Sequence, residues 1–238
     1  MIFNKFFILF KIGRKIGKSN IINIVSETHK IPVFIKLFFN LLAFSFSSSN
    51  NTKSKGKENL SESIQEMGTT FIKLGQFLAT RPDIIGEKLS KELESLQDKL
   101  PPFSKKEAEK IIIENLGQSN FDDIIDLSEP IAAASIAQVH KAKIKEDNII
   151  KNVAIKVLRP NIKKIFNDEI DAIMLLAYIV ESLITKTKRL KLIEVVFLFK
   201  EITNHEMDLR FEAAAANEYA ENTKNDLGFF VPKIYWNF

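Results

Sequence analysis

The sequence predicts an α+β fold, and three observations support that prediction. Hydrophobic residues recur at three- and four-residue steps over residues 60–115 and again over residues 162–222, which is typical of amphipathic helices. Between these runs lie two short segments rich in Ala, Val and Ile, residues 130–144 and 152–158, which are typical of strands. The chain has 238 residues and is 45% hydrophobic, so it contains enough apolar material for one substantial domain or two small ones.

Composition excludes several classes of protein. The chain has no cysteine, which excludes a disulfide scaffold, a thiolate zinc site and a cysteine nucleophile. Its three histidines, His29, His140 and His205, are far apart in the sequence, so a histidine metal site is not expected. The net charge of +4 comes from residues 1–46, and the remaining residues carry 27 basic and 29 acidic side chains. A body without excess positive charge disfavours binding to nucleic acid.

Residues 1–46 form a basic and aromatic segment. They contain seven basic residues, one acidic residue and nine of the 20 phenylalanines. Their apolar stretches are shorter than the ~20 residues that a spanning helix needs, and basic residues follow the first stretch instead of preceding it as in a secretory signal. The pattern favours a membrane-surface segment whose cations face anionic headgroups. The alternative is that the aromatic side chains pack on the body of the protein and the lysines are solvated.

The next segments predict a linker followed by helices. Residues 47–59 are rich in Ser, Asn and Lys and contain no apolar residue, which is typical of a linker. The Arg-Pro-Asp triplet centred on Pro82 breaks the first helical run, and a further amphipathic run covers residues 89–100. Ser104 with Glu107 three residues later predicts a capping box at the start of another helix.

The second half of the chain predicts a small sheet followed by helices. Residues 145–151 are expected to connect the two strand segments as a hairpin. Helical periodicity then returns in three segments, residues 162–184, 190–202 and 208–222. Residues 229–236 are a candidate for a last short strand, and Pro232 would place that strand at the edge of the sheet.

The tetrapeptide Val-Ala-Ile-Lys that ends at Lys156 is the first motif with a chemical meaning. A lysine at the end of an apolar strand is expected to be at least partly buried and to need an anionic partner. In protein kinases, the lysine of this motif contacts the α- and β-phosphates of ATP and pairs with a glutamate of the C helix. Alone, the tetrapeptide is a weak signal, because apolar strands that end in lysine are common.

An alanine-rich segment stands upstream, where a kinase carries its glycine-rich loop. It consists of Ala132, Ala133, Ala134 and Ser135. Methyl groups at these positions restrict the backbone and limit how closely its amides approach a phosphate. The alternative interpretation is a patch of small residues at a close packing contact.

A third motif lies within the first helical run. A glycine inside a helix costs ~1 kcal/mol relative to alanine, so Gly75 is expected to have a packing reason. Lys73 and Gln76 are three residues apart and share a helix face, so both could point into a cleft. The alternative is that both side chains are solvated on an exposed face.

Several motifs in one order resemble the UbiB-type family of atypical, protein-kinase-like proteins associated with ubiquinone biosynthesis. The resemblance runs from about Ile64 to Trp236. The motifs are KLGQ from Lys73, TRPD from Thr80, LQDK from Leu96, PIAAASIAQV from Pro130, VAIKVLRP from Val153 and EMDLRFEAAAAN from Glu206.

The resemblance implies roles for two groups outside the strands. Lys73, Gly75 and Gln76 match the KxGQ motif, whose helix covers the groove in which ordinary kinases bind a protein substrate. Glu206 and Asp208 match the family's ExD motif, whose glutamate is expected to meet Lys73.

The resemblance also implies a nucleotide site for ATP or ADP with Mg²⁺. Residues 132–135 match the alanine-rich loop that replaces the glycine-rich loop and alters nucleotide preference. Lys156 matches the ATP-binding lysine, and Glu212 matches the C-helix glutamate that pairs with it. The implied fold is a kinase-like small lobe, an antiparallel sheet plus a C helix, with a helical N-terminal extension and an inserted helical segment.

The expected domain boundaries follow from these assignments. They are the membrane-surface segment at 1–46, the linker at 47–59, the helical extension at 60–118 and the small lobe at 119–238, with inserted helices at 162–202.

The sequence departs from the kinase pattern after Glu212. A kinase needs a catalytic-loop Asp, an Asn and a DFG-type Asp for the metal, and only 26 residues follow Glu212. The triplet that begins at Asp226 mimics DFG, but it precedes the last expected strand and is therefore a decoy. The sequence thus predicts a truncated or split protein, without ATPase or kinase activity of its own and with no catalytic or metal residues in this chain.

The implied partners are an anionic membrane surface, a separately encoded C-terminal half, and ubiquinone-biosynthesis proteins or prenylated precursors. The implied location is peripheral, on the cytoplasmic face of a bacterial inner membrane. Two alternatives stay open. One is a non-catalytic membrane-associated module that binds a lipid or a partner, and the other is a non-functional gene remnant.

Overall fold

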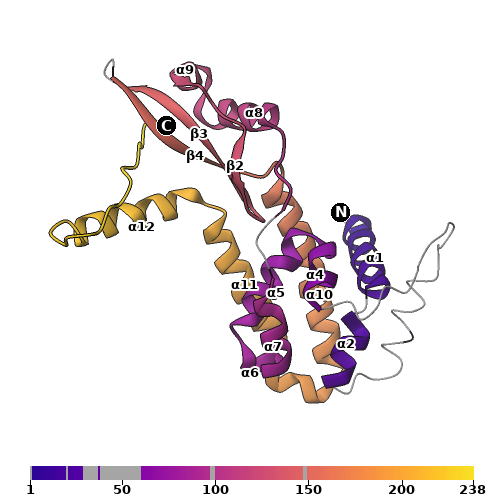
Figure 1. Ribbon diagram of the computed structural model, residues 1–238. Coiled ribbons are helices and arrows are strands. Elements are labelled where there is room, and N and C mark those ends of the chain that lie inside the picture. The colour runs from indigo at the N-terminus through magenta and orange to yellow at the C-terminus, as the bar shows by residue number, and fades with distance from the viewer. Residues whose placement is uncertain (1, 20, 29–36, 38–59, 97–99, 147–148) are drawn as a thin grey trace. The chain divides into compact units, whose positions relative to one another are not determined.

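The chain folds into two compact units, each described here by itself. The computed structural model describes residues 2–19, 21–28, 37, 60–96, 100–146 and 149–238 (Figure 1). The helical unit contains residues 1–98 and 164–200, and the sheet unit contains residues 99–163 and 201–238. The linker expected at residues 47–59 lies outside the described residues.

The helical unit is built from helices packed around a leucine-rich core. Its elements are α1 (Ile2–Lys18), α2 (Ile21–Thr28), α4 (Leu60–Met67), α5 (Thr69–Ala79), α6 (Pro82–Ile85), α7 (Glu87–Glu94), most of α10 (Ile162–Leu183), the 3₁₀ turn Thr185–Leu190 and the first part of α11 (Leu192–Glu206). Leu60, Leu89, Leu93 and Leu96 form a buried cluster. Three aromatic rings form a second cluster. The ring centre of Phe199 lies 5.6 Å from the ring centres of both Phe77 and Phe166.

The helix breaks in this unit follow glycine and proline. Pro82 is the first residue of α6, as the Arg-Pro-Asp triplet predicts. The break at Gly68 is not apparent from the hydrophobic pattern, which continues from α4 into α5. Gly68 has φ 105°, a left-handed value that favours glycine, and the chain therefore turns there.

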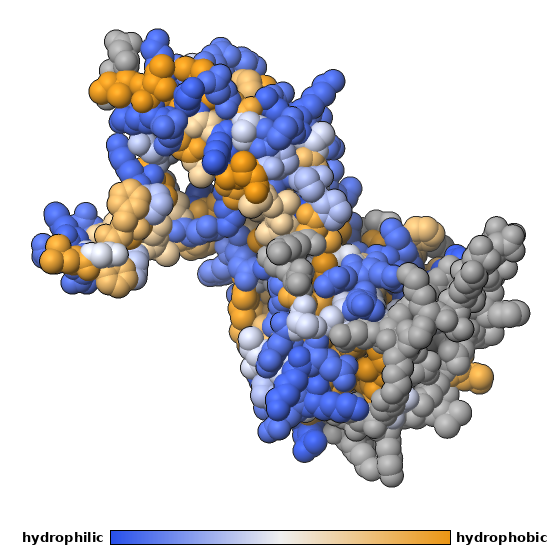
Figure 2. Space-filling model, in the orientation of Figure 1, coloured by the Kyte–Doolittle hydropathy of each residue, from blue (hydrophilic) through white to orange (hydrophobic). Residues whose placement is uncertain are grey.

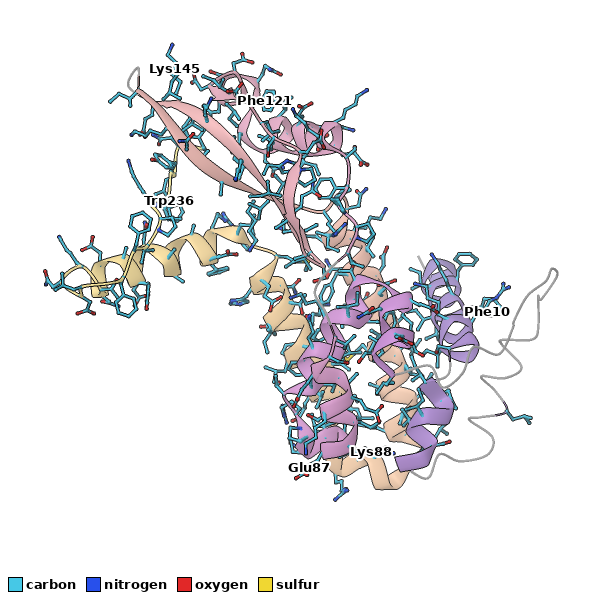
Figure 3. All side chains as sticks on the ribbon, viewed as in Figure 1. Phe10, Glu87, Lys88, Phe121, Lys145 and Trp236 are labelled. Carbon is cyan, nitrogen blue, oxygen red and sulfur yellow. The ribbon has the colours of Figure 1, made fainter. Side chains whose placement is uncertain are left out.

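Within residues 2–28, the described part of the basic N-terminal segment forms helices α1 and α2, which contact this core. Ile12 of α1 is buried, and the ammonium group of Lys15 donates a hydrogen bond to the carbonyl oxygen of Met67 at 2.6 Å. Ile24 of α2 packs against the leucine cluster. Phe7, by contrast, is 66% exposed, and Phe10 points away from the other helices (Figure 3). The segment thus contributes side chains to the core and also presents apolar surface, and no helix among the described residues is long and apolar enough to cross a membrane.

The sheet unit begins with helices that cover one face of the sheet. They are α8 (Lys105–Leu116) and α9 (Gln118–Asp122). The predicted capping box is confirmed, because the hydroxyl of Ser104 accepts from the Glu107 amide and the Glu107 carboxylate accepts from the Ser104 amide. Helix α8 groups with the sheet, although the expected boundary at residue 118 assigns it to the helical extension.

The sheet has four antiparallel strands. They are β1 (Ile124–Ile125), β2 (Pro130–Ala133), β3 (Ala137–Glu146) and β4 (Ile149–Leu158). β3 is central and pairs with β1, β2 and β4, the last in continuous register from Ala137 opposite Leu158 to Glu146 opposite Ile149. Figure 2 shows apolar side chains at the end of the β3–β4 hairpin, where Ile149 and Ile150 are 58% and 60% exposed.

Two boundary predictions in the sheet are wrong. Residues 130–144 were expected as one extended segment, but the chain turns after Ala133, and the amide of Ala134 donates to the carbonyl oxygen of Ala137 at 2.8 Å. The hairpin connection is also shorter than residues 145–151, since both strands extend into it. The ladder continues there because alternating residues such as Ile144 still reach the core.

The two faces of the sheet differ. Gln138, His140, Ala142 and Ile144 of β3 are buried on the face that α8 covers, where Ile112 and Val157 complete the core. Phe121 of α9 packs against the same cluster (Figure 3). Because side chains alternate along a strand, Val139 and Lys156 belong to the opposite face.

The chain ends with helices and an irregular segment. The predicted helices at 162–184, 190–202 and 208–222 are confirmed as α10, α11 and α12 (Leu209–Asn222). The strand predicted at residues 229–236 is wrong, because these residues have no strand conformation. Pro232 lacks an amide hydrogen, and side chains hold the segment instead, with the Lys233 ammonium 3.7 Å from the Glu146 carboxylate.

Candidate functional site

Lys156 and Glu212 form an ion pair in the sheet unit. The Nζ atom of Lys156 lies 2.5 Å from the Oε2 atom of Glu212, across 56 residues of sequence. Glu212 is in the first turn of α12, where the helix dipole favours a negative charge. Lys156 thus has the anionic partner that the sequence predicts. The side chains of Lys156 and Glu212 are 39% and 61% exposed, so the lysine is more exposed to solvent than a position on an apolar strand predicts.

The alanine-rich segment lies on the same row of the sheet as Lys156. Ala132 pairs with Val139 of β3, and Val139 pairs with Lys156 of β4. Neighbouring strands are about 4.8 Å apart, so the backbones of Ala132 and Lys156 are separated by only about 10 Å. The register therefore brings the end of the alanine-rich strand and the lysine to one face of one sheet.

The alanine-rich segment changes conformation within its four residues. Ala132 and Ala133 belong to β2, whereas Ala134 and Ser135 enter the turn before β3. Ser135 is fully buried, and Ala132 is exposed. The segment also borders an open hollow of about 450 Å³, which is lined by Leu100, Pro102, Pro130, Ile131, Ala132 and Ala133.

Asp208 occupies the N-cap of α12 and carries a perturbed carboxylate. Its oxygen accepts hydrogen bonds from the Nε atom of Arg210 at 2.8 Å and from the Arg210 amide at 3.2 Å. The hydrogen bond from the Arg210 side chain, aided by the backbone bond and by the charges of Arg210 and Lys163, lowers the pKa of Asp208 to about 2. Asp208 is therefore a charged helix cap at neutral pH.

The KxGQ residues lie on α5 of the helical unit. Lys73 and Gln76 are half-buried, and Gly75 is buried. A Cβ atom at Gly75 would clash with the Cδ1 atom of Leu96, so the glycine has the packing reason that its cost in a helix implies. Glu206 ends α11 in the sheet unit, and its pairing with Lys73 stays a prediction because the two residues belong to different units.

Sequence reasoning missed a side-chain network beneath the alanine-rich segment. The side chain of Gln138 pairs with the backbone of Phe103 through both of its polar atoms, accepting at 2.9 Å and donating at 3.1 Å. The Nδ1 atom of His140 lies 2.8 Å from the carbonyl oxygen of Ser128, which can only accept, so Nδ1 carries the hydrogen. Its Nε2 atom then accepts from the Gln138 amide at 2.9 Å.

Sequence reasoning also missed Arg159, which follows β4. Its guanidinium donates to the carbonyl oxygens of Ala134, Pro101 and Leu100. The signal available in the sequence is the position of Arg159 in the VAIKVLRP motif, three residues after Lys156.

No metal cluster accompanies these residues in the part of the chain that the structure describes. Within it, no group of three or more His, Cys, Asp or Glu side chains could hold a metal ion. The antiparallel sheet, the strand lysine and the helix glutamate together define a protein of the kinase-like small-lobe class.

Comparisons with known proteins place the chain more narrowly. The family model of the ABC1 atypical kinase-like domain matches residues 95–238. Proteins named "Probable protein kinase UbiB" are similar over most of the chain. The protein from Cellvibrio japonicus is 34% identical over 209 residues, which are 87% of this chain and 37% of the relative. The protein from Pseudomonas paraeruginosa is 31% identical over 231 residues, which are 96% of this chain and 43% of the relative.

The chain belongs to the UbiB-type family of ABC1 atypical kinase-like proteins. It spans about two fifths of the length of the curated relatives that it matches.

Proposed function

We propose that the sheet unit is the nucleotide-binding lobe of an atypical kinase or ATPase that supports ubiquinone biosynthesis. The observation that carries this proposal is the Lys156–Glu212 ion pair on the sheet row that ends at Ala132. The ligand is ATP or ADP with Mg²⁺, and the bound Mg²⁺ supplies charge neutralisation at the phosphates.

Lys156, Glu212 and Ala132 have different roles in the proposed nucleotide site. Lys156 is an exposed ammonium on a flexible stem, so it can reach a phosphate from the sheet. Glu212 holds the ammonium in place from the start of α12, which keeps the lysine directed before a nucleotide arrives. Ala132 contributes only a methyl group, which leaves space on the sheet face.

Phosphoryl transfer needs further groups, namely a residue that orients the nucleophile and carboxylate or amide ligands for the metal. We propose that polypeptide outside these 238 residues supplies them, either in the same protein or as a separate C-terminal half. Ubiquinone-biosynthesis proteins or prenylated precursors are the proposed partners or substrates.

A second candidate function is a non-catalytic membrane-associated module. The exposed side chain of Phe7 on α1, a helix that carries basic residues, favours it. In this role the protein would lie on an anionic membrane surface, peripheral to the cytoplasmic face of a bacterial inner membrane, and bind a lipid or partner protein.

The deciding experiment is a thermal-shift measurement of the purified chain with MgATP and MgADP. At ten times the Kd, ligand binding stabilises a protein by about 1.4 kcal/mol, which raises the Tm by about 3–6 °C for a chain of this size. We expect the wild type to show this shift and Lys156→Ala to lose it. A folded wild-type chain that shows no shift with either nucleotide would contradict the proposal and favour the membrane-associated module.

The chain offers a closely matched control variant. Lys143 lies on the same face of the sheet, about 14 Å along the strands from Lys156, and pairs with Asp126 at 2.7 Å. Its exposure and that of its partner, 45% and 63%, resemble those of Lys156 and Glu212. Lys143→Ala therefore removes an equivalent ion pair, and we expect it to keep the full nucleotide shift.

A further inference from the structure

Arg159 joins two segments that are far apart in the sequence. Its Nε and Nη2 atoms donate to the carbonyl oxygen of Ala134 at 3.0 and 2.8 Å. Its Nη1 atom donates to the carbonyl oxygen of Pro101 at 3.0 Å, and Nη2 also reaches that of Leu100 at 3.4 Å. One side chain thus bridges the alanine turn, residues 134–137, and the strap, residues 100–103.

The backbone of Arg159 holds the same turn. Its amide donates to the carbonyl oxygen of Ile136 at 2.9 Å. The turn is closed internally by the hydrogen bond from the Ala134 amide to the Ala137 carbonyl oxygen. The alanine turn is therefore held by three kinds of bond: one within the turn, one from the backbone amide of Arg159 and a charge-assisted fork from the Arg159 guanidinium.

Two further contacts, one from Gln138 and one from Arg159 itself, hold Phe103 of the strap. The buried side chain of Gln138 pairs with both backbone polar groups of Phe103. The guanidinium carbon of Arg159 lies 6.0 Å from the centre of the Phe103 ring, within the range of a cation–π contact. Arg159 thus ties the alanine turn to a segment that is itself anchored on the covered face of the sheet.

We propose that Arg159 is a positioning residue for nucleotide binding, and this inference rests on the proposed function. It fixes the alanine turn against the strap, so that the turn presents a defined backbone to the nucleotide while Lys156 contacts the phosphates. A loop that borders a ligand supports tight binding only if it is already ordered, since ordering a loop on binding costs affinity. Arg159 supplies that orientation in place of the side-chain contacts that alanine cannot make.

Geometry, and not charge, is the property that the proposed role requires. A guanidinium is a planar fork that reaches three carbonyl oxygens at once, whereas an ammonium is a point charge that cannot span them. Arg159→Lys keeps the charge and loses the fork, and Arg159→Met keeps most of the apolar stem and loses both. If Arg159 acted only by attracting phosphate, Arg159→Lys would bind nucleotide as the wild type does.

The experiment measures two quantities on the full 238-residue chain. The first is the Kd for MgADP and MgATP by calorimetry, and the second is the hydrogen exchange of the Ala134 amide without nucleotide. We expect both Arg159→Lys and Arg159→Met to raise the Kd at least tenfold and to accelerate exchange at Ala134 at least tenfold. Arg189→Lys, at an exposed arginine of the helical unit, is the control and is expected to change neither.

The outcomes separate this inference from the proposed function. Wild-type affinity in Arg159→Lys, or unchanged exchange at Ala134 in both variants, overturns the positioning role while nucleotide binding by the wild type stands. A wild-type chain that binds neither nucleotide overturns the proposed function, and the role of Arg159 falls with it. If Arg159→Met does not fold, Arg159→Lys still decides, because lysine retains the positive charge and the apolar stem of the side chain.

Discussion

The charge state of Asp208, which matches the second acidic residue of the ExD motif, is determined by its neighbours. Its side chain caps α12 and holds Arg210, and those contacts lower its pKa to about 2. Because the folded-state pKa lies below the unfolded value of about 3.9, the ionised carboxylate stabilises the fold above about pH 4. This contribution is lost as the pH falls from about 4 through about 2.

We therefore expect the carboxyl carbon of Asp208 to titrate with a midpoint near 2 in a pH series of NMR spectra. Arg210→Gln removes the main cause of the shift and is expected to move the midpoint upward, toward the ordinary aspartate value. A midpoint near 4 in the wild type would show that the Arg210 contact does not form in solution. Asp208→Asn keeps an oxygen for the cap but has no charge to lose, so its free energy of unfolding should fall less steeply than that of the wild type between about pH 4 and about pH 2.

The contacts of a single residue were predictable from the sequence where both partners lie close together in the chain or belong to a recognised motif. The capping box of Ser104 and Glu107 needs only three residues of sequence, and the structure confirms it. The partnership of Lys156 and Glu212 followed from motif resemblance, and the two atoms meet across 56 residues. Arg159 and Gln138 could not be assigned in this way, because their partners are backbone groups of segments that only the folded chain brings near.

At the level of elements, Gly75 lets α5 pack closely against Leu96, two residues after the end of α7. Replacing glycine by alanine inside a helix normally stabilises it by ~1 kcal/mol. Here the added methyl group would clash with the Cδ1 atom of the buried Leu96 side chain, and overpacking a core costs about 1–3 kcal/mol. We expect Gly75→Ala to lower the free energy of unfolding by about 1 kcal/mol, measured by urea denaturation.

A double-mutant cycle separates the clash from the helix effect. Leu96→Ala removes the atoms that the new methyl group would meet, so Gly75→Ala should stabilise the protein in that background by about 0.5–1 kcal/mol. A stabilising effect of Gly75→Ala in the wild type would mean that Leu96 moves aside without cost, and the assigned packing reason would then be wrong.

Elements were predictable where periodicity is long and were misplaced where it is short. The helices α10, α11 and α12 each repeat their apolar positions over several turns, and the sequence locates them to within a few residues. Residues 131–137 are all apolar or small and contain no glycine or proline, so nothing in their composition marks where the chain turns after Ala133. Residues 229–236 have the composition of a strand, but their contacts come from side chains such as Lys233.

At the level of the whole molecule, we expect the chain to bind nucleotide without hydrolysing it. Phosphoryl transfer depends on positioned metal ions and on a group that orients the nucleophile, and the sequence after Glu212 contains no catalytic-loop motif. We expect the purified chain to release no phosphate from MgATP above the rate in buffer, as measured by a coupled phosphate assay. Mg²⁺-dependent turnover that disappears in Lys156→Ala would contradict this expectation.

The sequence predicted the whole molecule at the coarse level only. The α+β class and the kinase-like lobe are confirmed, since both depend on segments with clear patterns and on motifs in a fixed order. The grouping of residues 164–200 with residues 1–98 could not be predicted, because it depends on contacts such as that between Phe77 and Phe199.

The exposed position of α12 has a consequence for how its movement could be observed. None of its side chains is buried, and its ion pair with the sheet is open to solvent. Detachment of such a helix uncovers little apolar area, so it would change neither the heat capacity nor the urea dependence of the protein appreciably. Dissolved salt weakens solvent-exposed ion pairs, so it acts directly on the Lys156–Glu212 pair. Ionic strength, and not denaturant, is therefore the variable that reports on the attachment of α12.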